Sequence, residues 1–150
     1  MGHTLMSNFG AHFASRYAGG GTAVAAGTGD ATKVTGTTVD RRDFYAGALV
    51  IAFSAVLAAT KTVSFAVEIQ ESADGSTWGT AEALQAATVA ETGESGGSTE
   101  VGTVQINVNY LGRKRYVRFN VTPDLSNTAT DTLAWRAAAI LGGANTLPAV

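Results

Sequence analysis

The chain has 150 residues, no cysteine and a formal net charge of −2, and only 15% of its residues are charged. This length fits one domain with a substantial core, and the lack of cysteine excludes disulfides and thiolate metal sites. The slightly acidic balance disfavours nucleic acid as a partner, because proteins that follow a phosphate backbone carry a basic surface. No apolar run reaches the roughly 18 residues of a membrane span, so we expect no membrane partner.

Residues 1–40 are predicted to form an extended N-terminal arm. Glycines at positions 19–21, 27 and 29 lie among alanine and threonine, and side chains this small cannot build a core of their own. Residues 1–7 lack the cationic and apolar regions of an export signal, so we expect synthesis and assembly in the host cytoplasm.

Four larger apolar side chains recur every four residues in this arm: Leu5, Phe9, Phe13 and Tyr17. On a helix, this spacing places them along one slowly drifting face. Such a face could anchor the arm to a neighbouring surface. The alternative is that these side chains cover the chain's own β domain.

Residues 41–150 are predicted to form that domain. Successive side chains of a strand point to opposite faces of the sheet, and in residues 49–57 both sets of alternate positions are largely apolar. This pattern favours a central strand covered on both faces. Residues 63–70 alternate cleanly, with four apolar side chains on one face: Val63, Phe65, Val67 and Ile69. The turn chemistry of residues 72–76 predicts a hairpin whose returning strand begins at Thr77.

The later part of the domain contains three more candidate strands. Residues 82–90 are ambiguous between helix and strand, and residues 91–98 are expected to be a loop. Residues 104–109 and 116–122 are predicted to pair as a second hairpin, Pro123 to end its second strand, and residues 132–141 to form the last strand. Six or so short strands without long helices predict an all-β, antiparallel β-sandwich that is jelly-roll-like.

Residues that could carry chemistry are sparse. Both histidines, His3 and His12, lie in the predicted arm, so an activated nucleophile would need a base from that arm, and their spacing does not fit a zinc site. The close carboxylate pairs are Glu68 with Glu71 and Asp40 with Asp43, and solvated strand residues explain them better than glycoside hydrolysis. We therefore expect no enzyme, no metal site and no cofactor.

One basic cluster follows residue 112. Arg113, Lys114 and Arg115 are expected at a turn, with Arg118 in the strand that follows. The acidic balance of the whole chain argues against an RNA-binding strand. Polar contact with an acidic partner surface, or protection of a sheet edge, is the more economical interpretation.

Three segments together resemble the small head-decoration proteins of tailed phages: residues 67–78 (VEIQESADGSTW), residues 115–122 (RYVRFNVT) and residues 131–135 (DTLAW). The resemblance extends over residues 44–143. It implies a trimeric or dimeric β module that binds the major capsid protein on the outer surface of the virion and clamps neighbouring capsomers of the expanded head. Phage tail or baseplate components and carbohydrate-binding β-sandwich modules also contain the DGSTW hairpin, so both remain alternative functions.

Overall fold

The computed structural model describes residues 9–144. Within this range, β-strands account for almost all regular structure, and no helix has the length and hydropathy to cross a membrane. The elements are η1 (Phe9–His12), β1 (Ala14–Val24), β2 (Val34–Thr35), β3 (Val39–Asp40), β4 (Ala46–Leu57), β5 (Thr62–Ser72), β6 (Glu82–Thr92), β7 (Ser98–Asn109), β8 (Tyr116–Leu125) and β9 (Thr132–Gly142).

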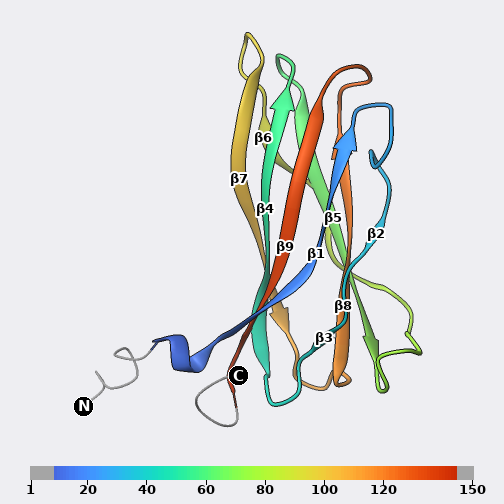
Figure 1. Ribbon diagram of the computed structural model, residues 1–150, viewed down its shortest axis with the longest axis vertical. Helices are drawn as coiled ribbons and strands as arrows, with labels where there is room; N and C mark the ends of the chain where they lie inside the picture. Colours follow the sequence, from blue (N-terminus) through green and yellow to red (C-terminus); the bar gives the residue numbers. More distant parts are fainter. Residues whose placement is uncertain (1–8, 145–150) are drawn as a thin grey trace.

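The strands form two antiparallel sheets that pack face to face (Figure 1). The first sheet has the order β1-β9-β4-β7, and the second has the order β2-β8-β5-β6, with β3 also paired to β8. Most connections between consecutive strands cross from one sheet to the other. This order is a jelly roll, which confirms the predicted all-β, jelly-roll-like antiparallel sandwich.

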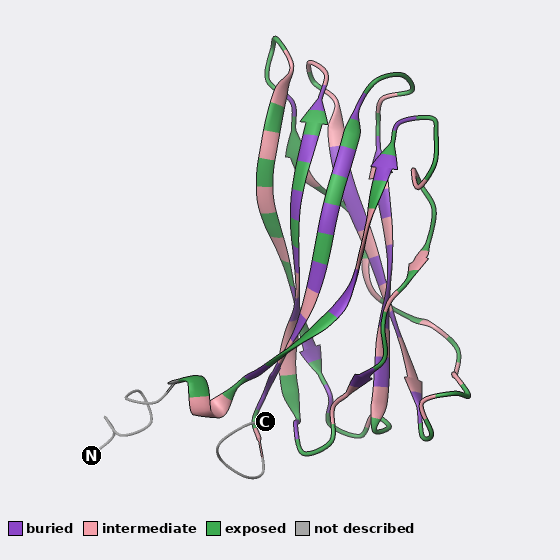
Figure 2. Ribbon diagram, in the orientation of Figure 1, coloured by how far each residue is buried: buried purple, intermediate pink, exposed green. Residues whose placement is uncertain are grey.

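The core lies between the sheets and follows the period-two pattern of the strands. Along β5, Val63, Phe65 and Val67 are fully buried, as predicted, and Figure 2 shows the alternation of buried and exposed residues along β9 and β4. The Phe65 ring lies 5.4 Å from that of Phe53 on β4 and 6.4 Å from that of Trp135 on β9, measured between ring centres. These rings therefore join the two sheets through apolar contact.

The expectation that β4 is covered on both faces is wrong. Its inward residues are buried, but Ala52, Ser54 and Val56 on its other face are exposed. The strand lies between β9 and β7 within its sheet, so its backbone is paired on both edges while one of its faces stays open. These side chains are small enough to remain exposed to solvent. The prediction of a strand buried on both faces rested only on their low polarity.

Residues 14–40 do not form a separate extended arm. β1 pairs with β9 along its whole length, with a bulge between Tyr17 and Gly19, and Ala18 and Ala23 are buried in the core. β2 and β3 pair with β8. The small residues that suggested flexibility instead permit close packing: a Cβ at Gly36 would lie 2.3 Å from the carbonyl oxygens of Ala18 and Phe119.

Three strand predictions also need correction. The strand that returns after the hairpin begins at Glu82 and not at Thr77, so the ambiguous residues 82–90 belong to β6. β7 and β8 do not form a hairpin, because β7 pairs with β4 and β8 with β5. Pro123 does not end β8 but lies inside it. β2 pairs with β8 only at Asn120 and Val121, so the missing N–H of Pro123 removes no hydrogen bond to β2.

Candidate functional site

The predicted helical face of aromatic anchors is not formed. Leu5 lies outside the described residues, Phe9 begins the short 3-10 helix η1 and its side chain is not described, and Tyr17 belongs to β1. Phe13 links these two elements, and its ring lies against Gly142 at the end of β9. The four-residue spacing predicted a helix, but residues 14–24 form a strand because their backbone pairs with β9.

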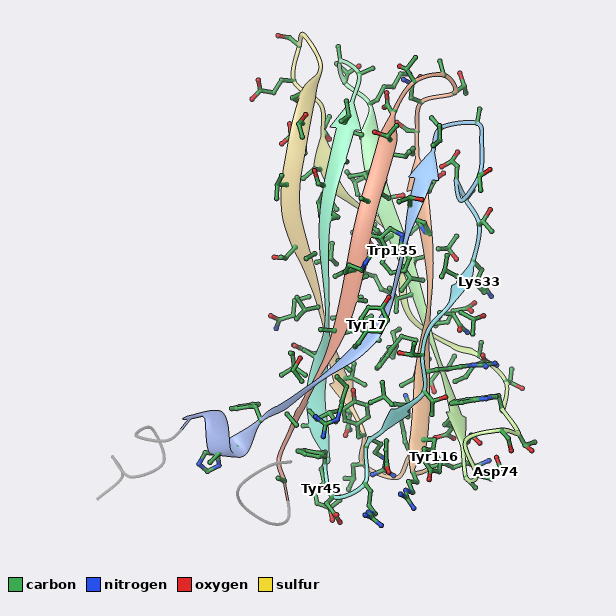
Figure 3. The ribbon with its side chains drawn as sticks, in the orientation of Figure 1. Tyr17, Lys33, Tyr45, Asp74, Tyr116 and Trp135 are labelled. Carbon is green, nitrogen blue, oxygen red and sulfur yellow. The ribbon has the colours of Figure 1, made fainter. Side chains whose placement is uncertain are left out.

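Two of these anchors still lie at the surface. The side chain of Tyr17 is 57% exposed and that of Phe13 is 37% exposed. Figure 3 shows Tyr17 and Tyr45 in the half of the sandwich where β1 begins and β9 ends. This part of the molecule therefore presents aromatic area, although contact with a partner stays a prediction.

The basic turn between β7 and β8 is largely neutralised by the chain's own carboxylates. The guanidinium of Arg113 donates to both carboxylate oxygens of Glu82 at 2.9 and 3.0 Å, and that of Arg115 donates to Asp40 at 2.6 to 3.2 Å. These hydrogen bonds hold the pKa values of Glu82 and Asp40 below their usual range. The two arginines therefore brace the turn against β6 and β3.

Lys114 differs from its two neighbours. Its residue is exposed, and its backbone N–H donates to Oε2 of Glu71 at 3.0 Å. Of the three predicted partner-binding cations, the two arginines are thus committed to ion pairs within the chain. Contacts of Arg113, Lys114 and Arg115 with another protein stay a prediction.

The candidate catalytic carboxylates also have structural partners. Glu68 pairs with Lys33 at 2.6 Å, and Asp43 lies 3.7 Å from the Nε of Arg42. Within residues 9–144, no three His, Cys, Asp or Glu side chains lie close enough together to hold a metal ion. Glu68 and Asp43 thus each lie beside a cation of the same chain.

Asp74 organises the turn that was predicted at residues 72–76 (Figure 3). Its Oδ1 accepts hydrogen bonds from the backbone N–H groups of Ser76 at 2.8 Å and Thr77 at 2.7 Å, and from the hydroxyl of Ser72 at 2.8 Å. Because these donors favour the charged form, they hold the pKa of Asp74 far below its usual range. The loop is a hydrogen-bonded turn, as expected from its sequence.

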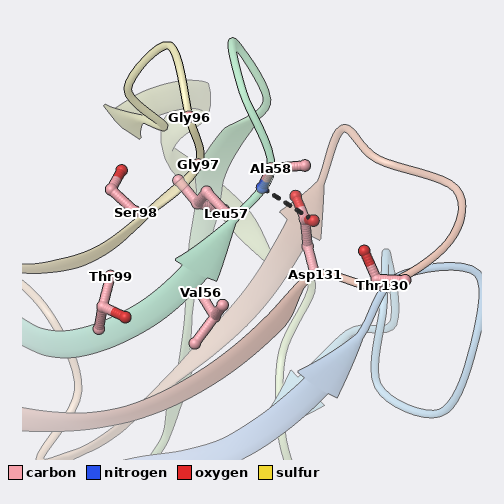
Figure 4. A pocket seen from close by; sticks show the side chains of 9 residues that line it. All are labelled: Val56, Leu57, Ala58, Gly96, Gly97, Ser98, Thr99, Thr130 and Asp131. Atoms are coloured by element: carbon pink, nitrogen blue, oxygen red, sulfur yellow. Dashed lines mark hydrogen bonds between the residues drawn. The ribbon is translucent and has the colours of Figure 1, made fainter.

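Sequence reasoning missed a pocket of about 380 Å³ at the end of the sandwich where β4 ends and β9 begins (Figure 4). Asp131, which is 2% exposed, lines it; its Oδ1 accepts from the backbone N–H of Ala58 at 3.0 Å and from Nδ2 of Asn127 at 2.6 Å. Its Oδ2 has no hydrogen-bond partner in the described part of the chain. The other lining residues are small, hydroxyl-bearing or aliphatic, so Asp131 is the one ionisable group among the described residues of this pocket. Its hydrogen bond to Ala58 ties the loop before β9 to the loop after β4.

The two tryptophans do not provide an open platform for stacking a sugar ring. Trp135 is 2% exposed, and the guanidinium of Arg118 lies 4.3 Å from the ring centre of Trp78. Nε of Arg118 also donates to Oε1 of Gln70 at 3.0 Å, which fixes it over the ring. The described residues therefore give no direct support to the carbohydrate-binding alternative.

No family model and no curated protein matches the chain. Among solved structures, it is similar to a chain of infectious bursal disease virus, Gx strain, with a TM-score of 0.50, 10% identity and 91% of this chain covered. A chain of T=1 particles derived from infectious bursal virus also gives a TM-score of 0.50, with 8% identity and 87% covered. The protein spans 33% and 31% of the length of those two chains, respectively.

A xylan-binding domain, CBM22-1 from Paenibacillus barcinonensis Xyn10C, is similar over 90% of this chain and 88% of its own length, with a TM-score of 0.40 and 12% identity. At identities this low, the likeness to the virus chains concerns the fold. The fold is thus one that proteins of virus particles also adopt.

Proposed function

We propose that this chain is a structural protein of a virus particle, and specifically a decoration protein on the outer surface of a tailed-phage head. The strand order β1-β9-β4-β7 facing β2-β8-β5-β6 carries the proposal, because chains of assembled virus particles share this jelly roll. Fold alone leaves function open. The resemblance of residues 67–78, 115–122 and 131–135 to phage head-decoration proteins narrows the proposal to this class.

In this role the protein acts by adhesion and carries out no reaction. Its partners are the major capsid protein and further copies of itself, in a trimer or a dimer. Each copy binds across neighbouring capsomers of the expanded head, and the stabilisation is multiplied because many copies bind one shell. The carboxylates and arginines described above support this view, since they are engaged in holding the fold.

The contact with the capsid involves the aromatic anchors near the chain start. Tyr17 and Phe13 present exposed rings there, and Leu5 and Phe9 precede them in the sequence. Aromatic side chains contribute large apolar area with few rotatable bonds, which favours them at protein interfaces. Lys114 and the paired arginines of the β7–β8 turn add polar contacts.

The test compares binding to isolated expanded heads that lack the decoration protein. Deletion of residues 1–12 removes the segment before β1 and leaves that strand intact, and Tyr17→Ser removes one exposed ring. Val89→Ser on β6 is the matched control, because Val89 is 55% exposed and Tyr17 is 57% exposed. We expect the deletion and Tyr17→Ser each to lower head occupancy at least tenfold, and Val89→Ser to leave it unchanged.

Undiminished occupancy with both altered chains would contradict the anchor assignment. Failure of the unaltered protein to bind heads, together with its absence from purified particles, would contradict the decoration role. Recovery with isolated tails would instead favour the tail or baseplate alternative. Binding of a glycan array that is lost in Trp78→Ala would favour the carbohydrate-binding alternative.

A further inference from the structure

We infer that the outward face of the first sheet is a contact surface between two copies of this chain; this inference rests on the proposed function and assigns its self-association to one face. The face consists of five cross-strand rows, each with one outward residue from β1, β9, β4 and β7. The first row contains Ala48 and the last contains Val56. We call this surface the neutral face.

The neutral face is almost free of charge. Its positions are filled mainly by alanine, serine, threonine, valine and glycine, and Arg136 is its one charged residue. Several of the large apolar side chains exposed in the described chain lie on it: Val24, Val56 and Val101, the last with 76% exposure. Tyr17, which is assigned to the capsid contact, lies at its margin on the edge strand β1. Burial of such a surface against another protein costs little desolvation free energy, because few of its side chains are charged.

Arg136 is held against this surface by hydrogen bonds to the backbone. Its Nη1 donates to the carbonyl oxygen of Trp135 at 2.7 Å and to that of Gly21 at 3.4 Å. A Cβ at Gly20 would lie 2.5 Å from Cδ of Arg136, so the missing side chain provides the space in which the arginine lies along the sheet. The cation is thus directed towards the edge strand β1.

The outward face of the second sheet has the opposite character. Lys33 pairs there with Glu68, and Arg118 donates to Gln70 while it covers Trp78. These charged and polar groups satisfy one another and remain partly hydrated. One sandwich therefore carries a face with several charged groups and a neutral face with a single charged residue, Arg136.

The dimensions of the neutral face fit a second copy. Four strands about 4.8 Å apart and about ten residues long at about 3.4 Å per residue cover roughly 650 Å². A standard interface buries about 800 Å² per partner, with a lower limit near 600 Å². The same face on a second copy is equally neutral, and its small side chains allow two sheets to pack at about 10 Å. A two-fold arrangement of this kind closes as a dimer.

The test is sedimentation equilibrium of the full chain over a range of concentrations. We expect the unaltered protein to form dimers of twice the 15.3 kDa chain mass. Ala134→Lys places a second cation among uncharged neighbours on the neutral face and should raise the dissociation constant at least tenfold. Ala87→Lys makes the same change at an exposed position of β6 and should leave it unchanged.

Circular dichroism checks that each chain is folded, and Val101→Lys at the edge strand β7 replaces Ala134→Lys if that chain unfolds. A monomeric or trimeric unaltered protein would overturn the inference. Dimers that persist in the folded lysine variant of the neutral face, or that are lost equally in Ala87→Lys, would overturn it as well. Head binding measures the proposed function separately, so dimers without head binding would contradict only that function.

Discussion

Replacement of Phe65 by alanine tests whether the aromatic contacts between the sheets hold the sandwich together. Phe65 is fully buried, and its ring contacts Phe53 and Trp135 of the opposite sheet. Truncation of a buried phenylalanine costs about 3 to 5 kcal/mol, and the loss of two ring contacts places Phe65→Ala at about 4 to 5 kcal/mol. At about 2 to 4 °C per kcal/mol, the melting temperature should fall by roughly 8 to 20 °C.

Urea unfolding followed by circular dichroism measures this cost. The control is Val89→Ala on β6, where a half-exposed side chain should change the free energy of unfolding by less than about 0.5 kcal/mol. A cost below about 2 kcal/mol for Phe65→Ala would show that the two sheets do not depend on this aromatic contact.

Two further predictions concern a glycine and an ion pair. Gly36→Ala should destabilise the fold by about 2 to 3 kcal/mol, because its Cβ would press on backbone oxygens of β1 and β8, whereas Gly96→Ala, with no atom near the new Cβ, should change little in the same urea assay. Arg115 lowers the pKa of Asp40, so this ion pair stabilises the protein above the unfolded pKa of about 3.9, and the stabilisation is lost as pH falls through the lower folded pKa. Since both side chains are about 40% exposed, the gap in unfolding free energy between the unaltered protein and Asp40→Asn should stay below about 1 kcal/mol at pH 7 and narrow as the pH is lowered further below about 3.9; a gap that does not narrow would contradict the assignment.

The sandwich could be predicted where side chains alternate strictly between apolar and polar. This period places Val63, Phe65, Val67 and Ile69 on one face of a strand, and all four lie in the core. The turn at Asp74 was predictable for a similar reason, because its hydrogen bonds are local and involve residues within three positions. Local pattern and local chemistry thus determine these parts.

Pairing between distant strands could not be predicted from such patterns. β1 was missed because its alanines and glycines resemble a flexible segment, although they match the close approach of β9 and of Gly36. The β7–β8 connection looks like a hairpin in sequence, yet the chain changes sheets there. Which strand lies beside which depends on packing across the whole core.

The candidate site was predictable only in part. The exposure of Tyr17 agrees with an anchor at the surface, but its place on a strand depends on pairing with β9. Arg113 and Arg115 were identified as a basic cluster, whereas their ion pairs with Glu82 and Asp40 involve residues 31 and 75 positions away. The pocket beside Asp131 arises from three loops that the sequence does not connect.

Whether this chain decorates the outside of a phage head is best decided by an electron-microscopy map of intact virions that contain it. We expect two-sheet density, into which the jelly roll fits, repeated across the outside of the head at the junctions of capsomers. Density for the chain in the tail alone would contradict this role.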